Sequence, residues 1–208
     1  MSSQPADLPR SLGVATGCAT ALLVIYGIAV WTVAGQVADT RAMLIVAEAL
    51  EGAQWTATIL WLVSPVSVLL ATLAVVSTAV LLRQPRSAVA AGLTVVGTVL
   101  GAEVLKVVLT RPSWLDDAGN SLPSGHVAAA AGLTAGAILS VPAALRPVVG
   151  MMGAGVVAAT GLATMAQGWH RPSDVAASIF LAIAVAASTY VAIQAPPVRG
   201  DQPMALHT

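Results

Sequence analysis

Residues 87–109 read SAVAAGLTVVGTVLGAEVLKVVL, an apolar run in which Glu103 and Lys106 are the only charged positions. The hydrocarbon core of a bilayer is about 30 Å thick, so an α-helix needs roughly 20 apolar residues to cross it. The run therefore predicts a transmembrane helix with two charges near its C-terminal end. Because a charge at membrane depth is costly, these two residues also indicate a functional position.

Five other runs of similar character predict five more membrane helices. They are Leu12 to Gly35, Thr56 to Leu82, Ser124 to Val141, Pro147 to Ala166 and Asp174 to Gln194. Hydrophobic residues make up 57% of the chain and charged residues 9%, which excludes a soluble domain because its surface would lack polar groups. We therefore expect an all-α, polytopic bundle of six transmembrane helices over residues 12–194, between polar tails at 1–11 and 195–208.

The rest of the composition narrows the classes of partner. The chain carries no net charge, so no basic field predicts nucleic-acid binding, and membrane lipids are the expected surroundings. The single cysteine, Cys18, cannot form an internal disulfide. The first run could instead be a cleaved signal peptide preceded by Arg10, but it is much longer than the apolar core of a usual signal peptide. Nothing in the sequence predicts an oligomeric state.

The arginines predict the orientation of the bundle. In a bundle of six membrane helices, both termini and the second and fourth connections lie on one side. That side carries Arg10, Arg83, Arg86, Arg146 and Arg199. The connections on the opposite side carry Asp39, Glu48, Glu51, Asp116 and Asp117. Near that same boundary lie Trp31, Trp55, Trp114 and Trp169. Since basic loops stay in the cytoplasm, we expect a multi-pass cell-membrane protein with cytoplasmic termini. The chain is rich in arginine and poor in lysine, a composition typical of GC-rich bacteria.

Three polar clusters fall at the outer ends of the third to sixth predicted helices. They are Lys106 with Arg111-Pro112, then Pro123-Ser124-Gly125-His126, then His170-Arg171-Pro172-Ser173-Asp174. With Pro123 in the first turn of a helix, the backbone N–H groups of Ser124 and Gly125 are expected to be open to an anion such as phosphate. Two histidines beside that anion can act as nucleophile and acid, because histidine titrates near neutral pH.

These clusters resemble the signature of the type 2 phosphatidic acid phosphatase superfamily, in its membrane-bound lipid phosphatase branch, which has the acid phosphatase/vanadium haloperoxidase fold. That signature has a Lys and an Arg-Pro, then Pro-Ser-Gly-His, then Ser-Arg-x5-His-x3-Asp. Residues 123–126 match the second part letter for letter, and His170 and Asp174 match the third with the required spacing. The resemblance covers residues 100–180 of the chain.

The resemblance implies a metal-independent phosphatase that needs no cofactor and acts through a phosphohistidine. It assigns His170 as the nucleophile, with Asp174 on its other ring nitrogen and His126 as the general acid that later activates water. Lys106 and Arg111 would neutralise the phosphoryl oxygens. The implied substrate is a lipid phosphate, either a phosphomonoester or a pyrophosphate, of polyprenyl or glycerophospholipid type, and the active site would face the outside of the membrane.

The spacing of the first part departs from the signature. Four residues separate Lys106 from Arg111 where the family has six, so a continuous helix would point the two side chains apart. Pro112 disfavours helical geometry at Arg111. We therefore expect the helix to end near Thr110 and the arginine to turn back toward the lysine.

The third part lacks its arginine. Thr164 stands at that position, and its hydroxyl can bind phosphate but carries no charge. Arg171, next to the nucleophile, could compensate, or it could instead anchor to lipid headgroups. Without compensation we expect reduced turnover or a reduced preference for highly charged pyrophosphates.

Three other interpretations stay open. Lys106 could merely pair with Glu103, one turn away on the same helix. The protein could be a catalytically weak relative that binds or translocates a phospholipid or polyprenyl phosphate. A metal-dependent hydrolase is less favoured, because Asp116 and Asp117 have no evident third ligand and suit a solvated loop. His207 lies in the C-terminal tail and has no expected role.

Overall fold

The computed structural model describes residues 7–115 and 120–194, and these ranges contain helices and no strand. The predicted tails lie largely outside them, as do Asp116, Asp117, Arg199 and His207. The first helix begins at Asp7, inside the segment expected as a polar tail. The all-helical class is confirmed.

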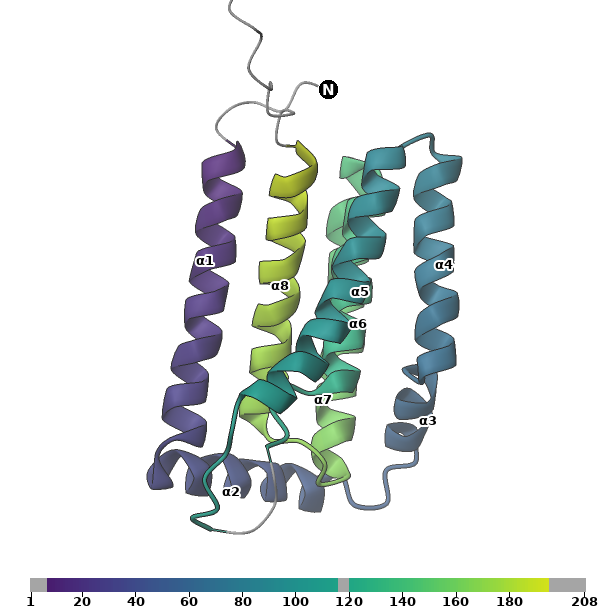
Figure 1. Ribbon diagram of the computed structural model, residues 1–208. Helices are drawn as coiled ribbons and strands as arrows, with labels where there is room; N and C mark the ends of the chain where they lie inside the picture. Colours follow the sequence, from purple (N-terminus) through teal and green to yellow (C-terminus); the bar gives the residue numbers. More distant parts are fainter. Residues whose placement is uncertain (1–6, 116–119, 195–208) are drawn as a thin grey trace, which may run out of the picture.

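The described elements follow one another along the chain with short connections, except between α5 and α6, which are separated by residues 109–124. They are α1 (Asp7–Ile25), a π-helical turn (Tyr26–Val30), α2 (Val33–Ala49), α3 (Trp55–Leu62), α4 (Pro65–Leu81), α5 (Pro85–Val108), α6 (Gly125–Ser140), a 3-10 turn (Ala143–Leu145), α7 (Arg146–Ala166) and α8 (Pro172–Gln194). Figure 1 shows the long helices side by side in a bundle with α2 lying across one end.

Four of these helical stretches are long and apolar enough to cross a membrane, and a fifth span results if α3 and α4 count as one. α6 is apolar but has only 16 residues. Each of the six predicted runs therefore contains a helix or the bent pair. The number of six membrane spans itself stays a prediction, while several apolar helices fit a membrane protein.

The α3–α4 pair is bent by 57° where Ser64 and Pro65 interrupt the helical ladder. Proline has no N–H to donate and restricts the residue before it, so Ser64 is extended with ψ at 157°. The Ser64 side chain then caps α4 by accepting a hydrogen bond from the Ser67 N–H (3.4 Å). The sequence prediction of one continuous helix over residues 56–82 is therefore corrected to two shorter helices.

Small residues fill the interior of the bundle, while large apolar side chains cover its outside. A Cβ on Gly132 of α6 would lie 3.1 Å from the side chain of Thr98 on α5, so the two backbones approach closely there. Leu81 and Val107, in contrast, are 82% and 83% exposed. Close packing of small residues under an apolar exterior is typical of helices that pack within lipid.

The two ends of the bundle carry different side chains. The start of α1, the α4–α5 turn and the start of α7 lie at one end (Figure 1), and they contain Arg10, Arg83, Arg86 and Arg146. The opposite end carries the exposed tryptophans Trp31, Trp55, Trp114 and Trp169. This separation agrees with the predicted topology for the described residues, and the side of the membrane that each end faces stays a prediction.

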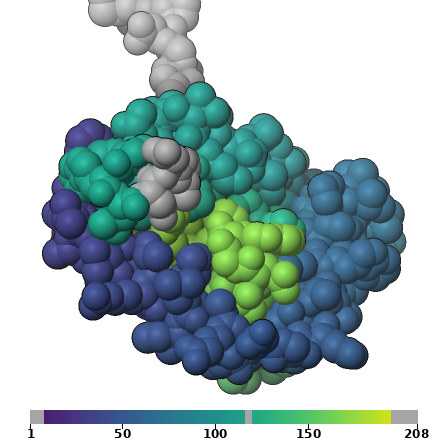
Figure 2. Space-filling model, turned by 90° about the horizontal axis from the view of Figure 1, so that it is seen from below, coloured from purple at the N-terminus to yellow at the C-terminus, as the bar shows by residue number. Residues whose placement is uncertain are grey.

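α2 is the element that the sequence did not predict. Residues 36–55 are a connection in the sequence prediction, but Thr32 caps a helix there by accepting a hydrogen bond from the Gly35 N–H (2.9 Å). Figure 2 views the molecule from this end and shows α2 along one side, with the turn between α7 and α8 near the centre. α2 therefore borders the end of the bundle where the predicted catalytic clusters lie.

Candidate active site

The segment that carries Arg111 is held from two neighbouring elements. α5 ends before Thr110, as expected from Pro112, and its C-cap, Leu109, is extended. The Tyr26 hydroxyl donates a hydrogen bond to the Thr110 carbonyl (2.7 Å), and Gln36 Nε2 donates one to the Pro112 carbonyl (3.0 Å). The π-helical turn and α2 thus fix the path of this segment. Arg111 itself does not line the pocket described below, but its charge acts on the Asp39 carboxyl group.

Lys106 lies in the last turn of α5 and faces the start of α6. Its Nζ forms an ion pair with Glu103 Oε1 at 2.8 Å, so the expected pairing within the helix is present. A Cβ on Gly125 would lie 3.1 Å from both Lys106 Nζ and Glu103 Oε1. Glycine at this position therefore lets a cation and a carboxylate approach the N-terminus of α6.

The start of α6 differs in detail from the prediction. Ser124 is the N-cap, and its hydroxyl accepts a hydrogen bond from the Val127 N–H (3.4 Å), so Pro123 precedes the helix rather than lying in its first turn. The Ser124 N–H donates to the Asp174 carbonyl (3.2 Å), which means that this group is not open to an anion. The open N–H groups of the first turn belong to Gly125 and His126, where the helix dipole favours negative charge.

The turn between α7 and α8 presents His170. Gly168 has a φ of 67°, a conformation that favours glycine, and it reverses the chain after α7. The N–H groups of Trp169 and His170 then donate to the Thr164 carbonyl (3.1 and 3.4 Å). His170 Nδ1 lies 3.3 Å from Oδ2 of Asp174, which is in the first turn of α8. The imidazole is thus held through Nδ1, and Nε2 is the nitrogen left for chemistry.

Asp174 is fully buried and anchors this turn. Its Oδ2 accepts hydrogen bonds from the Ser121 hydroxyl (2.6 Å) and from the Arg171 N–H (2.9 Å), in addition to its contact with His170. Ser121 Oγ in turn accepts a hydrogen bond from Arg171 Nη1 (3.1 Å). A carboxylate with several donors holds the imidazole beside it in one orientation.

Arg171 does not reach the surface. It is 6% exposed, and its Nε donates to Thr40 Oγ1 on α2 (3.2 Å), so the interpretation as a headgroup anchor is wrong. It also does not line the pocket. Its observed role is to join α2 to Ser121 and so to the Asp174 carboxylate.

Asp39 on α2 is a second link to the same turn, and it was expected only as a loop charge. Its carboxylate oxygens accept hydrogen bonds from the Ser173 N–H (2.9 Å) and from the Ser173 hydroxyl (2.5 Å). Burial raises the pKa of Asp39 above its ordinary value, although the bonds from Ser173 act in the opposite direction. Asp39 therefore caps the start of α8 from a neighbouring helix.

Thr164 is placed behind the turn and outside the pocket lining. Its hydroxyl donates to the Gly161 carbonyl of α7 (2.8 Å) and its side chain is completely buried. Its carbonyl holds the turn that carries His170. In this arrangement Thr164 shapes the site through its backbone.

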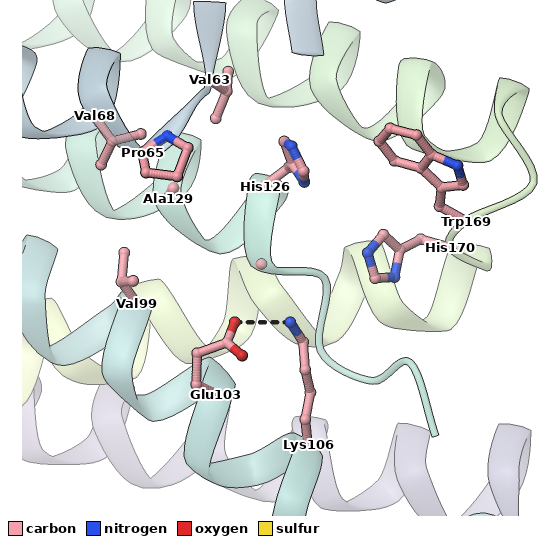
Figure 3. A pocket seen from close by; sticks show the side chains of 11 residues that line it. Val63, Pro65, Val68, Val99, Glu103, Lys106, His126, Ala129, Trp169 and His170 are labelled. Atoms are coloured by element: carbon pink, nitrogen blue, oxygen red, sulfur yellow. Dashed lines mark hydrogen bonds and ion pairs between the residues drawn. The ribbon is translucent and has the colours of Figure 1, made fainter. Parts of the chain in front are cut away.

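A pocket of about 480 Å³ lies where these segments meet. Figure 3 shows His126 and His170 directed into it with Trp169 beside them, while the Lys106–Glu103 pair faces them from α5. The ring centroids of Trp169 and His126 are 5.9 Å apart. The other lining residues are Val63, Pro65, Val68, Val99, Gly125 and Ala129. The pocket thus has a polar part with both histidines and an apolar part between α4, α5 and α6.

Sequence reasoning missed several residues that support this pocket. Asn120 Nδ2 donates to the carbonyls of Leu109 (2.8 Å) and Leu122 (3.0 Å) and so joins the end of α5 to the start of α6. Ser121 follows it directly and bonds Asp174. Closeness to the Pro-Ser-Gly-His run was the only signal for them. In residues 7–115 and 120–194, no group of three or more His, Cys, Asp or Glu side chains could hold a metal ion.

Comparison with known protein families gives a match. The family model described as the PAP2 superfamily matches residues 61–196, a range that contains all the predicted catalytic residues. No curated protein and no solved structure matches the chain.

Proposed function

The chain belongs to the PAP2 superfamily, whose members are generally phosphatases, and from this we propose that it hydrolyses a lipid phosphate through a phosphohistidine. The observation that carries the proposal is the pair of histidines at one pocket. His170 has Nδ1 held by a buried carboxylate, and His126 lies in the first turn of α6 with Lys106 nearby. This arrangement offers a nucleophile, an acid and an anion site together.

In the proposed first step, Nε2 of His170 attacks the phosphorus atom while the bond from phosphorus to the lipid oxygen breaks. The electron pair of that bond leaves with the oxygen, which takes a proton from His126 and departs as an alcohol. The positive charge that develops on the imidazole is stabilised by Asp174 at Nδ1. Lys106 and the N–H groups at the start of α6 stabilise the phosphoryl oxygens.

In the proposed second step, water attacks the phosphohistidine and gives a proton to His126. The phosphorus–nitrogen bond breaks, its electron pair returns to Nε2 of His170, and inorganic phosphate leaves. Both histidines then have their starting protonation states, so the cycle is balanced. This chemistry uses groups of the chain and water alone, so we expect activity without a divalent metal.

The apolar part of the pocket supports a lipid as the substrate. Val63, Val68 and Val99 line it next to the histidines, and they come from the bent α3–α4 pair and from α5, which are apolar enough to span a membrane. A phosphate carried on a hydrocarbon chain suits such a pocket because each end of the molecule meets its preferred surroundings. We propose a multi-pass membrane phosphatase whose site lies at the end opposite Arg10, Arg83, Arg86 and Arg146, and hence outside the cytoplasm.

The test is phosphate release by the purified protein in detergent, with chelator present, from polyprenyl phosphates, polyprenyl diphosphates, phosphatidic acid and phosphatidylglycerophosphate. We expect His170→Ala to abolish release and also to abolish an acid-labile phosphoryl-enzyme when labelled substrate is quenched in alkali. His207→Ala is the matched control, since this histidine lies outside the family match. Equal phosphate release by His170→Ala and the wild type would refute the mechanism.

A second candidate is a relative that binds or translocates a lipid phosphate with little turnover. It is favoured by one observation: the cation that lines the pocket, Lys106, is already paired with Glu103. Saturable binding of these lipids to the wild type, without phosphate release from any of them, would favour this function. Measurable turnover that depends on His170 would exclude it.

A further inference from the structure

Glu103 is an unusual residue for a pocket that has to bind an anion. Its side chain is 59% exposed and lines the same pocket as His126 and His170. Its carboxylate pairs with Lys106 and lies close to the first residue of α6. A carboxylate here offsets much of the positive charge that the lysine brings to the site.

The position of Glu103 along α5 is informative. Val99, Glu103 and Lys106 lie on successive turns of this helix and all face the pocket. Figure 3 shows Glu103 between Val99, on the apolar side, and Lys106, on the side of the histidines. The carboxylate therefore stands where the polar part of the pocket gives way to the apolar part.

A bound lipid phosphate would have to pass this point. The phosphoryl group under attack belongs beside His170, His126 and the start of α6, and the hydrocarbon chain belongs beside Val63 and Val99. The group that joins the two then lies next to Glu103. In a phosphomonoester that group is a neutral ester oxygen, whereas in a diphosphate it is a second, negatively charged phosphate.

We infer that Glu103 is a specificity-determining residue that makes this site select lipid phosphomonoesters over lipid diphosphates. The inference rests on the proposed function and narrows its substrate class. A negative charge on the inner phosphate is repelled by the carboxylate at close range in a pocket with few other charges. The leaving group of a diphosphate would also carry that charge past Glu103 as the bond breaks.

The experiment compares two substrates with the same hydrocarbon chain, farnesyl phosphate and farnesyl diphosphate. We expect the wild type to have a kcat/KM about tenfold or more higher for the monophosphate, from the size of one like-charge contact in a partly buried site. Glu103→Gln removes the charge and keeps the shape, so it should reduce this preference about tenfold. Glu48→Gln, on the exposed face of α2, is the charge-matched control and should leave the ratio unchanged.

The ratio of kcat/KM for the two substrates distinguishes an effect of Glu103 on selectivity from an effect on the fold. A change in Glu103 that only disturbed the fold would lower both values of kcat/KM and leave their ratio as it was. A wild type that prefers the diphosphate, or a Glu103→Gln variant with an unaltered ratio, would overturn the inference.

Binding distinguishes failure of this inference from failure of the proposed function. Affinities for both farnesyl compounds are measured on His170→Ala, with and without Glu103→Gln. We expect tighter binding of the monophosphate, and a smaller difference once the carboxylate is removed. If the wild type releases no phosphate, the proposed phosphatase activity is refuted while these affinities still decide the role of Glu103. Equal affinities on His170→Ala would overturn the inference.

Discussion

The two walls of the pocket are built in different ways. In the wall made by the turn between α7 and α8, the carboxylate of Asp174 is buried, and it accepts hydrogen bonds from Ser121 and the Arg171 backbone as well as contacting His170. The facing wall, at the end of α5, presents Lys106 and Glu103, which are 27% and 59% exposed and are joined by one ion pair. One wall is held from several sides and the other can rearrange.

This difference assigns different tasks to the two walls under the proposed function. A nucleophile must be held in one orientation, because stabilisation of a transition state depends on groups that need not reorganise. Recognition of a substrate tolerates side chains that adjust. Changes in the turn that carries His170 should therefore lower the rate for every substrate, whereas a change at Glu103 on α5 should alter which substrate is used.

The largest loss of activity is expected from a change in the wall made by the turn between α7 and α8. Asp174→Asn keeps the size of the side chain but removes the charge that stabilises the imidazolium and fixes its tautomer, so kcat should fall about a thousandfold or more. Phosphate release and phosphoryl-enzyme formation measure this loss. A value of kcat within a few-fold of the wild type would mean that the buried carboxylate does not support the nucleophile.

A smaller loss of activity is expected when the wall at the end of α5 loses its cation, Lys106. Lys106→Gln removes charge stabilisation from the phosphoryl oxygens, so kcat/KM should fall about a hundredfold. The double variant with Glu103→Gln tests whether the two residues act as a pair, because coupled residues have non-additive effects. Strict additivity of the two single changes would show that the ion pair has no function in the reaction.

A change in α2, which supports the turn that carries His170, should lower kcat still less. Asp39→Ala leaves the Ser173 N–H and hydroxyl without their acceptor, so we expect kcat to fall about tenfold with little change in KM. Asp39→Asn should recover part of the loss, because its amide oxygen can still accept from the Ser173 N–H. A change in KM alone would show that α2 acts on binding rather than on the orientation of His170.

The smallest expected effect is on the pH dependence of stability. Because burial raises the pKa of Asp39 in the folded protein, folding favours its protonated form. Its contribution is therefore present at low pH and is lost as pH rises from about 3.8 through the raised pKa. Unfolding midpoints in detergent between pH 4 and 7 should fall with pH more in the wild type than in Asp39→Asn. Parallel curves would contradict the raised pKa.

The sequence was sufficient to locate the bundle helices. Apolar runs of membrane length predicted each of them, because the length and the hydropathy of a run depend on local sequence alone. The bend at Ser64 and Pro65 could also be inferred from proline chemistry, but the unbroken hydropathy of residues 56–82 concealed it. α2 was missed because Asp39, Arg41 and Glu48 interrupt its apolar residues and its apolar face is weak.

The site was predictable in its chemistry but only partly in its contacts. His126 and His170 follow from the motif matches and Lys106 from its charge near the end of an apolar run, and the structure brings the three to one pocket. Arg171 had two open interpretations, because a sequence does not reveal whether a long cationic side chain finds a buried acceptor. Here the acceptors are Thr40, far away in the chain, and Ser121. Such long-range pairs depend on how α2 packs against the bundle.

The bend between α3 and α4 would affect how readily a hydrolysis reaction in this pocket could be reversed. Val63 and Pro65 flank the bend and line the apolar part of the pocket, so a lipid alcohol formed there could leave sideways among hydrocarbon chains. Inorganic phosphate, which is strongly hydrated, would depart to the aqueous phase. Because the two products partition into different phases, they would rarely meet again, and resynthesis of the ester would be suppressed by physical separation.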